Sequence, residues 1–72
     1  MIKTQTNVYD SSTVESSTYI YKTKELFITF KHATYVYHDV IEADYIQFRE
    51  SDSQGKALNQ FIKPYKFTKH ED

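Results

Sequence analysis

The sequence contains no cysteine and no tryptophan, and it has only one glycine and one proline. Without cysteine, neither a disulfide bond nor a zinc site built on thiolates can form. With Gly55 as its only glycine, the chain cannot contain a Walker-type phosphate loop, which needs two glycines at fixed spacing. No apolar run is long enough to span a membrane or to act as a secretion signal. We therefore expect no membrane association and a cytoplasmic location.

The chain also lacks a marked net charge, because nine basic residues nearly balance ten acids to give −1. Such a balance gives no overall attraction for polyanions. The charges are nevertheless segregated: residues 39–52 carry five acids with Arg49 as the only base, and residues 53–70 carry no acid. The basic block contains Lys56, Lys63, Lys66 and Lys69. These blocks are read either as two solvated faces or as a local basic surface for nucleic acid.

What the chain does have is aromatic residues, seven tyrosines and five phenylalanines among 72 residues. A domain of this size buries only about 60% of its unfolded surface. Its single core contributes roughly 3–5 kcal/mol net, so small domains need a further source of stability. Large rings supply much apolar area per residue, and we expect them to form the core. Dimerisation is the alternative source of stability.

The clearest local pattern is a β-hairpin over residues 26–38. Two short runs rich in β-branched and aromatic residues flank Lys31-His32-Ala33. Residues 14–21 are also rich in such residues and predict a preceding strand. We therefore expect a three-stranded antiparallel meander, and the alternation over residues 65–68 leaves a fourth, edge strand open.

The apolar spacing then changes from that of strands to that of helices. Ile41, Tyr45 and Phe48 are spaced as i, i+4, i+7, which predicts a helix ending near Glu50. Asp39 stands three residues before Glu42, as in a capping box at the helix start. A second short helix is indicated by apolar residues at 58, 61 and 62, and it ends before Pro64. The prediction is an α+β fold with two short helices packed on one face of a small sheet.

Several pieces of the sequence, in the correct order, resemble the KTSC domain family. They are Ser11-Ser12, Tyr19, Leu26–Phe30, Tyr35-Val36-Tyr37 followed by Asp39-Val40, Tyr45, and Ser53–Ile62 with its Ser-x-Gly-Lys-x-x-Asn-x-x-Ile pattern. The chain departs from the family pattern at the hairpin turn 31–33, at Thr18 and at Ile41. The start of the chain is polar and lacks periodicity, so we expect a loose N-terminal arm over residues 1–10, followed by one KTSC-like domain over 11–68 and a frayed end over 69–72. The resemblance implies RNA binding only through the family's occurrence at the end of some lysyl-tRNA synthetases.

The first candidate site lies at the start of the second predicted helix. Helix N-termini present free backbone N–H groups that suit a phosphate or carboxylate. Gly55 would let such a ligand approach closely, Ser53 offers a hydroxyl, Lys56 offers a charge, and Asn59 follows about one turn later. The alternative interpretation is a capped turn, with Ser53 as N-cap and Lys56 in solvent.

The second candidate site is the aromatic hairpin. Tyr35 and Tyr37 share one face of a strand, and with Lys66 nearby they would form a stacking platform for single-stranded nucleic acid. Alternatively, these tyrosines face the helices and belong to the core.

Catalysis and metal binding have little support in the sequence. The only histidines are His32, His38 and His70, and they lack a metal-binding spacing. We expect no enzyme activity, no cofactor and no metal. The leading hypothesis is a non-catalytic module that binds RNA or another phosphate-bearing ligand. The alternatives are a protein-interaction or self-association module and a pocket for a small nucleotide.

Overall fold

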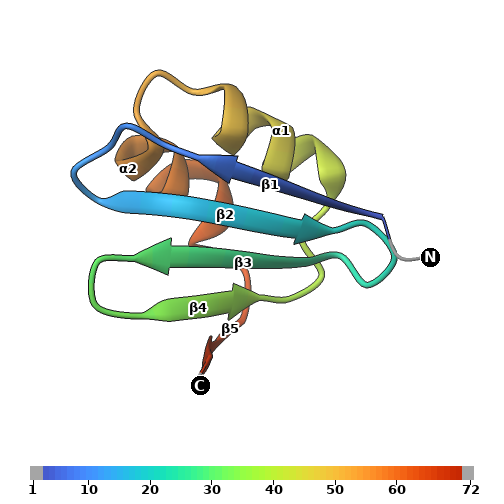
Figure 1. Ribbon diagram of the computed structural model, residues 1–72. Coiled ribbons are helices and arrows are strands. Elements are labelled where there is room, and N and C mark those ends of the chain that lie inside the picture. The colour runs from blue at the N-terminus through green and yellow to red at the C-terminus, as the bar shows by residue number, and fades with distance from the viewer. Residues whose placement is uncertain (1–2, 71–72) are drawn as a thin grey trace.

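The computed structural model describes residues 3–70, which form one α+β unit (Figure 1). The elements in chain order are β1 (Thr4–Val8), β2 (Val14–Ile20), β3 (Glu25–Phe30), β4 (Thr34–Tyr37), α1 (Glu42–Glu50), α2 (Gln54–Ala57), the π-helical turn η1 (Leu58–Ile62) and β5 (Phe67–His70). No helix among the described residues is both long enough and apolar enough to cross a membrane.

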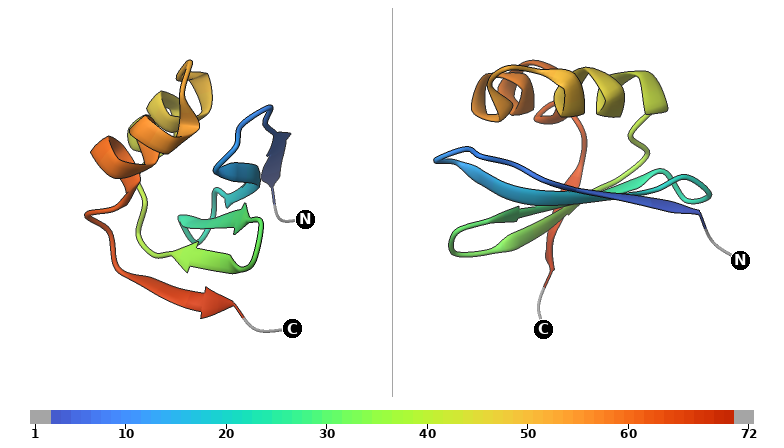
Figure 2. Two further views of the ribbon diagram at one scale, coloured as in Figure 1. Left: turned by 90° about the vertical axis from the view of Figure 1, so that its left-hand side faces the viewer. Right: turned by 45° about the horizontal axis from the view of Figure 1, so that its top comes forward.

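The five strands form one antiparallel sheet in the order β1-β2-β3-β4-β5. The helices, inserted between β4 and β5, lie on one side of this sheet and leave the other side open (Figure 2). The predicted class and the one-sided helix layer are therefore confirmed. The predicted number of strands was too small, because both outer strands lie partly or wholly in the segments expected to be loose.

Strand β1 is the main correction to the predicted organisation. It lies within residues 1–10, which were expected to form a loose arm, and it pairs with β2 from Thr4–Ile20 to Val8–Ser16. The sequence of β1, Thr-Gln-Thr-Asn-Val, shows no apolar alternation because neither of its faces is buried. Backbone pairing with β2 forms this strand. At the other end, β5 reaches His70, inside the segment 69–72 expected to fray, and residues 1–2 and 71–72 lie outside the described range.

A β-bulge explains why β2 alternates poorly in sequence. Val14 pairs with Phe30 and Ser16 with Thr29, so Glu15 is the extra residue. The bulge shifts the alternation by one position, and Val14, Ser17 and Tyr19 therefore all lie buried under the helices.

The core between sheet and helices is built around two stacked tyrosines. The rings of Tyr19 in β2 and Tyr45 in α1 are 4.4 Å apart and nearly parallel, at 11°. The Tyr19 hydroxyl donates a 2.6 Å hydrogen bond to the backbone oxygen of Val40, just before α1. This buried bond and the ring stack fix α1 against β2. The prediction that aromatic residues form much of the core is therefore confirmed.

Helix α1 does not begin with the predicted capping box. Asp39 adopts a left-handed conformation with φ of 58°, and Ile41 occupies the N-cap position without a side-chain cap. Instead, the hydroxyl of Tyr65, beyond η1, accepts a hydrogen bond from the Ile41 backbone N–H (3.4 Å) and donates one to Asp44. Tyr65, which follows the last helical turn, therefore supplies the hydrogen bonds that hold the first turn of α1 in place.

Candidate functional site

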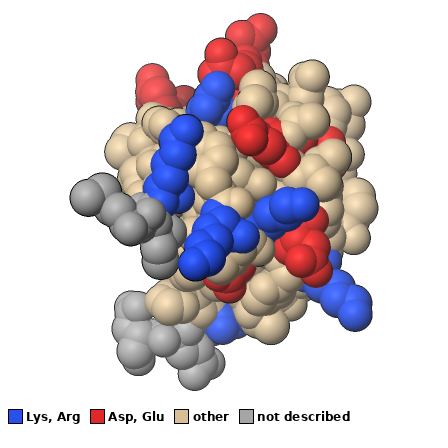
Figure 3. All heavy atoms as spheres, turned by 90° about the vertical axis from the view of Figure 1, so that its right-hand side faces the viewer, with Lys and Arg blue, Asp and Glu red and all other residues tan. Residues whose placement is uncertain are grey.

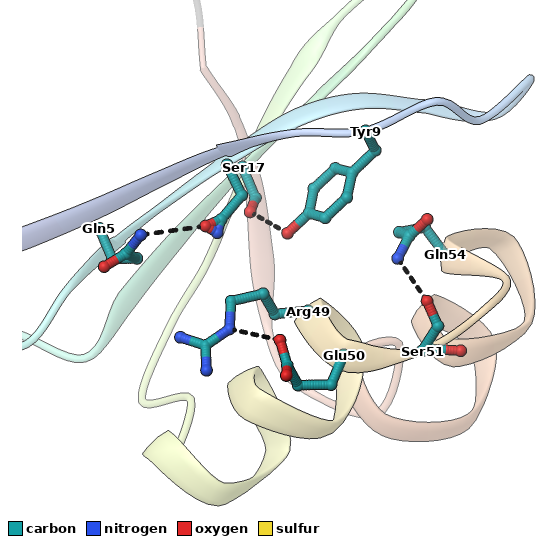
Figure 4. A network of polar contacts seen from close by, with 8 residues as sticks. Gln5, Tyr9, Ser17, Arg49, Glu50, Ser51 and Gln54 are labelled. Atoms are coloured by element: carbon teal, nitrogen blue, oxygen red, sulfur yellow. Dashed lines mark hydrogen bonds and ion pairs between the residues drawn. The ribbon is translucent and has the colours of Figure 1, made fainter.

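Ser53, Gly55, Lys56 and Asn59 lie in the helical layer, and α2 itself has only four residues. The Ser53 hydroxyl accepts a hydrogen bond from the Lys56 N–H at 3.4 Å, as an N-cap does. The segment is tied further by Gln54, whose side-chain amide donates to the Ser51 carbonyl at 2.8 Å (Figure 4). This is the local geometry of a capped turn. Lys56 and Asn59 are exposed.

Gly55 faces the side chain of Thr13, at the position where the sequence predicted the approach of a ligand. A Cβ atom added to Gly55 would lie 3.4 Å from the Thr13 hydroxyl oxygen, at the short end of the range of ordinary van der Waals contacts. Gly55 therefore packs against Thr13, the residue that precedes β2, in a position where a small side chain would also fit. This places Ser53–Asn59 on the β1–β2 side of the molecule, while Tyr35 and Lys66 lie on its β4–β5 side. The structure does not join the two predicted groups into one site.

Tyr35 and Tyr37 point toward the helical side of the sheet, on the same face as Leu26 and Ile28. Tyr37 is buried, with 6% of its surface exposed, and burial raises the pKa of its hydroxyl. Tyr35 is only half-buried. Tyr37 is therefore a core residue, and Tyr35 is the member of the pair that a ligand could reach.

A residue outside the predicted set completes an exposed aromatic surface beside Tyr35. The Phe67 ring in β5 is 54% exposed and meets the Tyr35 ring edge-on at 5.5 Å. On its other side, Tyr35 contacts Phe30 at 5.6 Å. Two exposed lysines belong to the same segment as Phe67: Lys69 pairs across the strands with Tyr35 and shares its face, and Lys66 directly precedes Phe67 in the chain. We call Phe30, Tyr35, Phe67, Lys66 and Lys69 the aromatic edge.

The charge on the aromatic edge has one sign over the described residues. Segments 31–37 and 65–70 contain Lys31, Lys66 and Lys69 and no acid. By contrast, basic and acidic side chains are interspersed on the end of the molecule that carries the β2–β3 turn (Figure 3). Rings and lysines without intervening carboxylates are the combination that single-stranded nucleic acid requires.

A link through His38 holds β5 in place on the open face of the sheet. The Nε2 atom of His38 lies 3.0 Å from the Thr68 hydroxyl, and Nδ1 lies 4.0 Å from a Glu25 carboxylate oxygen. The link joins β3, β4 and β5, and we interpret it as a clamp on the outer strand. Among residues 3–70 no group of three or more His, Asp or Glu residues is arranged to hold a metal.

A second polar region lies between β2 and α1, where Tyr9 from the β1–β2 loop hydrogen bonds Ser17 at 2.7 Å (Figure 4). Close to it, the buried Tyr45 hydroxyl lies beside the Arg49 guanidinium, which interacts with it without forming a hydrogen bond of normal geometry. Burial raises the pKa of Tyr45 to about 12, and the nearby Arg49 guanidinium partly opposes this rise. Because the hydroxyl lacks a well-formed hydrogen bond to any described residue, it contributes less to stability than the paired hydroxyl of Tyr19.

Comparison with known proteins gives a consistent result over most of the chain. A family model for the KTSC domain matches residues 10–67. Among solved structures, the crystal structure of a KTSC domain protein from Yersinia pestis superposes with a TM-score of 0.88. The two share 27% sequence identity, over 96% of this chain and 100% of that chain. No curated protein gives a significant match.

Proposed function

The chain belongs to the KTSC domain family, and on that premise we propose that it is a non-catalytic module that binds single-stranded RNA through the aromatic edge. The observation that carries the proposal is the exposed Phe67 ring, held edge-on against Tyr35, with Lys69 opposite Tyr35 on the same face and Lys66 next to Phe67 in the chain. The exposed Phe67 ring does not stand alone but contacts a second accessible ring, and adjacent aromatic rings are a surface on which unpaired bases can stack.

Each part of the edge has a separate role in this proposal. Phe67 and Tyr35 stack on bases, which contributes about 1–3 kcal/mol for each base. Lys66 and Lys69 contact phosphates and make binding salt-dependent. Phe30 and the buried Tyr37 support the two rings from below. Of the residues predicted from sequence, the proposal uses Tyr35 and Lys66 as ligand contacts.

An open surface supports a polymer better than a small nucleotide. No enclosed pocket is found among residues 3–70, and the rings of the aromatic edge follow one another across the sheet, from Phe30 in β3 over Tyr35 in β4 to Phe67 in β5. A strand of RNA can lie along such a row and expose its phosphates to the lysines of this edge. The turn at Ser53–Asn59, whose hydroxyl and amide groups bond within the chain, is not part of this surface.

The proposal is tested by fluorescence anisotropy with a labelled single-stranded RNA. Phe67→Ala should weaken binding by about 5- to 150-fold, the equivalent of one lost stacking contact. Ile41→Ala is the matched control, because Ile41 is similarly exposed at 48% but lies at the start of α1. The proposal fails if RNA does not bind at about 50 mM salt. It also fails if Phe67→Ala and Ile41→Ala bind equally well.

A further inference from the structure

The outer strand β1 exposes a row of backbone groups that no other strand contacts. Within the described residues β1 pairs only with β2, and four of its five residues are exposed, with Val8 at 84%. Between Thr4 and Val8 there is no charge, proline or glycine. Natural edge strands usually carry such residues, or a bulge, to prevent pairing with another chain.

The hydrogen bonds to β2 fix which residues of β1 point outward. The Tyr9 N–H donates to the Glu15 carbonyl at 2.9 Å, and the Tyr21 N–H donates to the Lys3 carbonyl at 3.2 Å. Because an antiparallel ladder alternates, the odd-numbered residues of β1 bond to β2 and the even-numbered residues point away. The outward N–H and C=O groups therefore belong to Thr4, Thr6 and Val8.

We propose that β1 pairs antiparallel with β1 of a second copy of this chain, with Thr6 opposite Thr6. In this register every outward residue meets another outward residue, since Thr4 then faces Val8 of the second copy. Shifting the register by two residues places either Thr4 opposite Asp10, outside β1, or Val8 opposite residue 2, outside the described range. The edge is thus complementary to itself, which is what a two-fold dimer requires.

The side chains of β1 suit the same register on both faces of the sheet. On the open face, the exposed Val8 is covered by the β-branched Thr4 of the second copy, a favourable type of cross-strand pair. On the helical side, Gln5 faces Asn7 of the second copy. Within one chain these two amides already hydrogen bond at 3.2 Å, so they can exchange bonds across the interface.

The opposite edge favours pairing of β1 with β1 over pairing of β1 with β5. The His38 N–H donates to the Lys66 carbonyl at 2.9 Å, so Phe67 and Lys69 present the outward groups of β5. Lysines on an edge strand oppose the approach of another strand. A dimer through β1 therefore closes without growing into a filament and leaves both aromatic edges at its two ends. This inference does not rest on RNA binding.

Charge substitution at the two-fold position tests both the dimer and its register. Sedimentation of the full chain over a range of concentrations should show reversible dimerisation. Thr6→Lys and Thr6→Glu should each raise the dissociation constant on the order of tenfold or more, because like charges then lie opposite each other. An equimolar mixture of the two variants should recover dimers. As a matched control, Thr23→Lys in the exposed β2–β3 turn should leave dimerisation unchanged.

A second measurement needs no variant. In the wild-type chain, amide hydrogen exchange at Thr4, Thr6 and Val8 should slow as protein concentration rises. Exchange at Phe67 and Lys69, which point outward on the other edge, should not change. A molecule that sediments as a monomer at every concentration overturns the proposal. So does dimerisation that is insensitive to charge at position 6.

Discussion

The two outer strands of the sheet differ in what they offer to a partner. Strand β1 presents uncharged, β-branched residues and free backbone groups, and few side chains cover it. Strand β5 presents an exposed phenylalanine and lysines, and His38 clamps it to the sheet. An edge made of backbone suits another strand, whereas an edge made of rings and charges suits bases and phosphates. If both proposals hold, one small sheet carries two independent binding surfaces, one on each outer strand.

The largest effect is expected from a core substitution in β3, the central strand, because unfolding the sheet removes both outer strands. Ile28 in β3 is fully buried and packs in the core. Ile28→Ala should lower the free energy of unfolding by about 2–5 kcal/mol, comparable with the whole stability of a domain of this size. Urea denaturation followed by circular dichroism measures this loss. A loss below about 1 kcal/mol would contradict the placement of Ile28 at the centre of the core.

Removing one ring from β5 should affect RNA binding without affecting dimerisation, and so shows whether the two proposed surfaces are independent. Phe67→Ala removes the stacking contact but not the outward groups of β1, so RNA binding should weaken as described above while dimerisation persists. Sedimentation and anisotropy on the same sample measure both. If dimerisation were lost with RNA binding, the two edges would not be independent.

A smaller effect is expected from one charge on the β5 edge. Lys69→Gln should lower the slope of log K against log salt by about 0.7, the contribution of one phosphate contact on a single strand. Lys22→Gln is the matched control, since Lys22 is also exposed but lies in the β2–β3 turn. Binding titrations between about 50 mM and about 200 mM salt give the slopes. Equal slopes for the two variants would count against Lys69 as a phosphate contact.

The buried tyrosines between the edges predict the response to alkaline pH. Burial raises the pKa of Tyr45 from 10.0 to about 12, and it also raises the pKa values of Tyr9 and Tyr37. A raised pKa means that the folded state holds its proton more tightly, so this contribution to stability is complete below pH 10. It is lost as the pH rises toward about 12. Thermal unfolding should therefore show a constant midpoint up to about pH 9.5 and a fall above it.

Tyr45→Phe is the smallest change, because it removes only a hydroxyl that lacks a well-formed hydrogen bond among residues 3–70. It should leave stability at pH 7 unchanged or slightly higher and should reduce the alkaline loss. Tyr19→Phe is the contrasting variant, since its hydroxyl donates to Val40, and it should lower stability by about 0.5–1.5 kcal/mol. Equal effects of the two variants at pH 7 would contradict the difference in hydrogen bonding between the two hydroxyls.

The parts of the fold that the sequence predicts are those with a buried face. Leu26 and Ile28 alternate because they contact the helices, and the hairpin they form is present as expected. Strand β1 escaped prediction because it has no buried face, and backbone pairing with β2 together with the Thr6–Thr18 hydroxyl contact defines it. The capping box failed because Asp39 adopts a left-handed conformation, and the bond to Ile41 comes from Tyr65, far along the chain.

The candidate site was only partly predictable for a similar reason. Tyr35 could be selected from the hairpin, but its exposed neighbours depend on how β5 aligns with β4. Both helices separate these strands in the sequence, so no local pattern sets the pairing of Tyr35 with Lys69. The alternation at residues 65–68 indicated a strand but not its register. Ser53 and Gly55 carry a recognisable motif, and in the structure that motif closes a turn against Thr13.

The account is tested most directly by titrating single-stranded RNA into isotope-labelled protein and following every backbone amide by NMR. The amides of Tyr35, Phe67 and Lys69 should shift first and most, and those of Thr4, Thr6 and Val8 should shift only with protein concentration. Shifts at Ser53–Asn59 or along β1 on addition of RNA, with none at Phe67, would contradict the assignment of separate partners to the two edges.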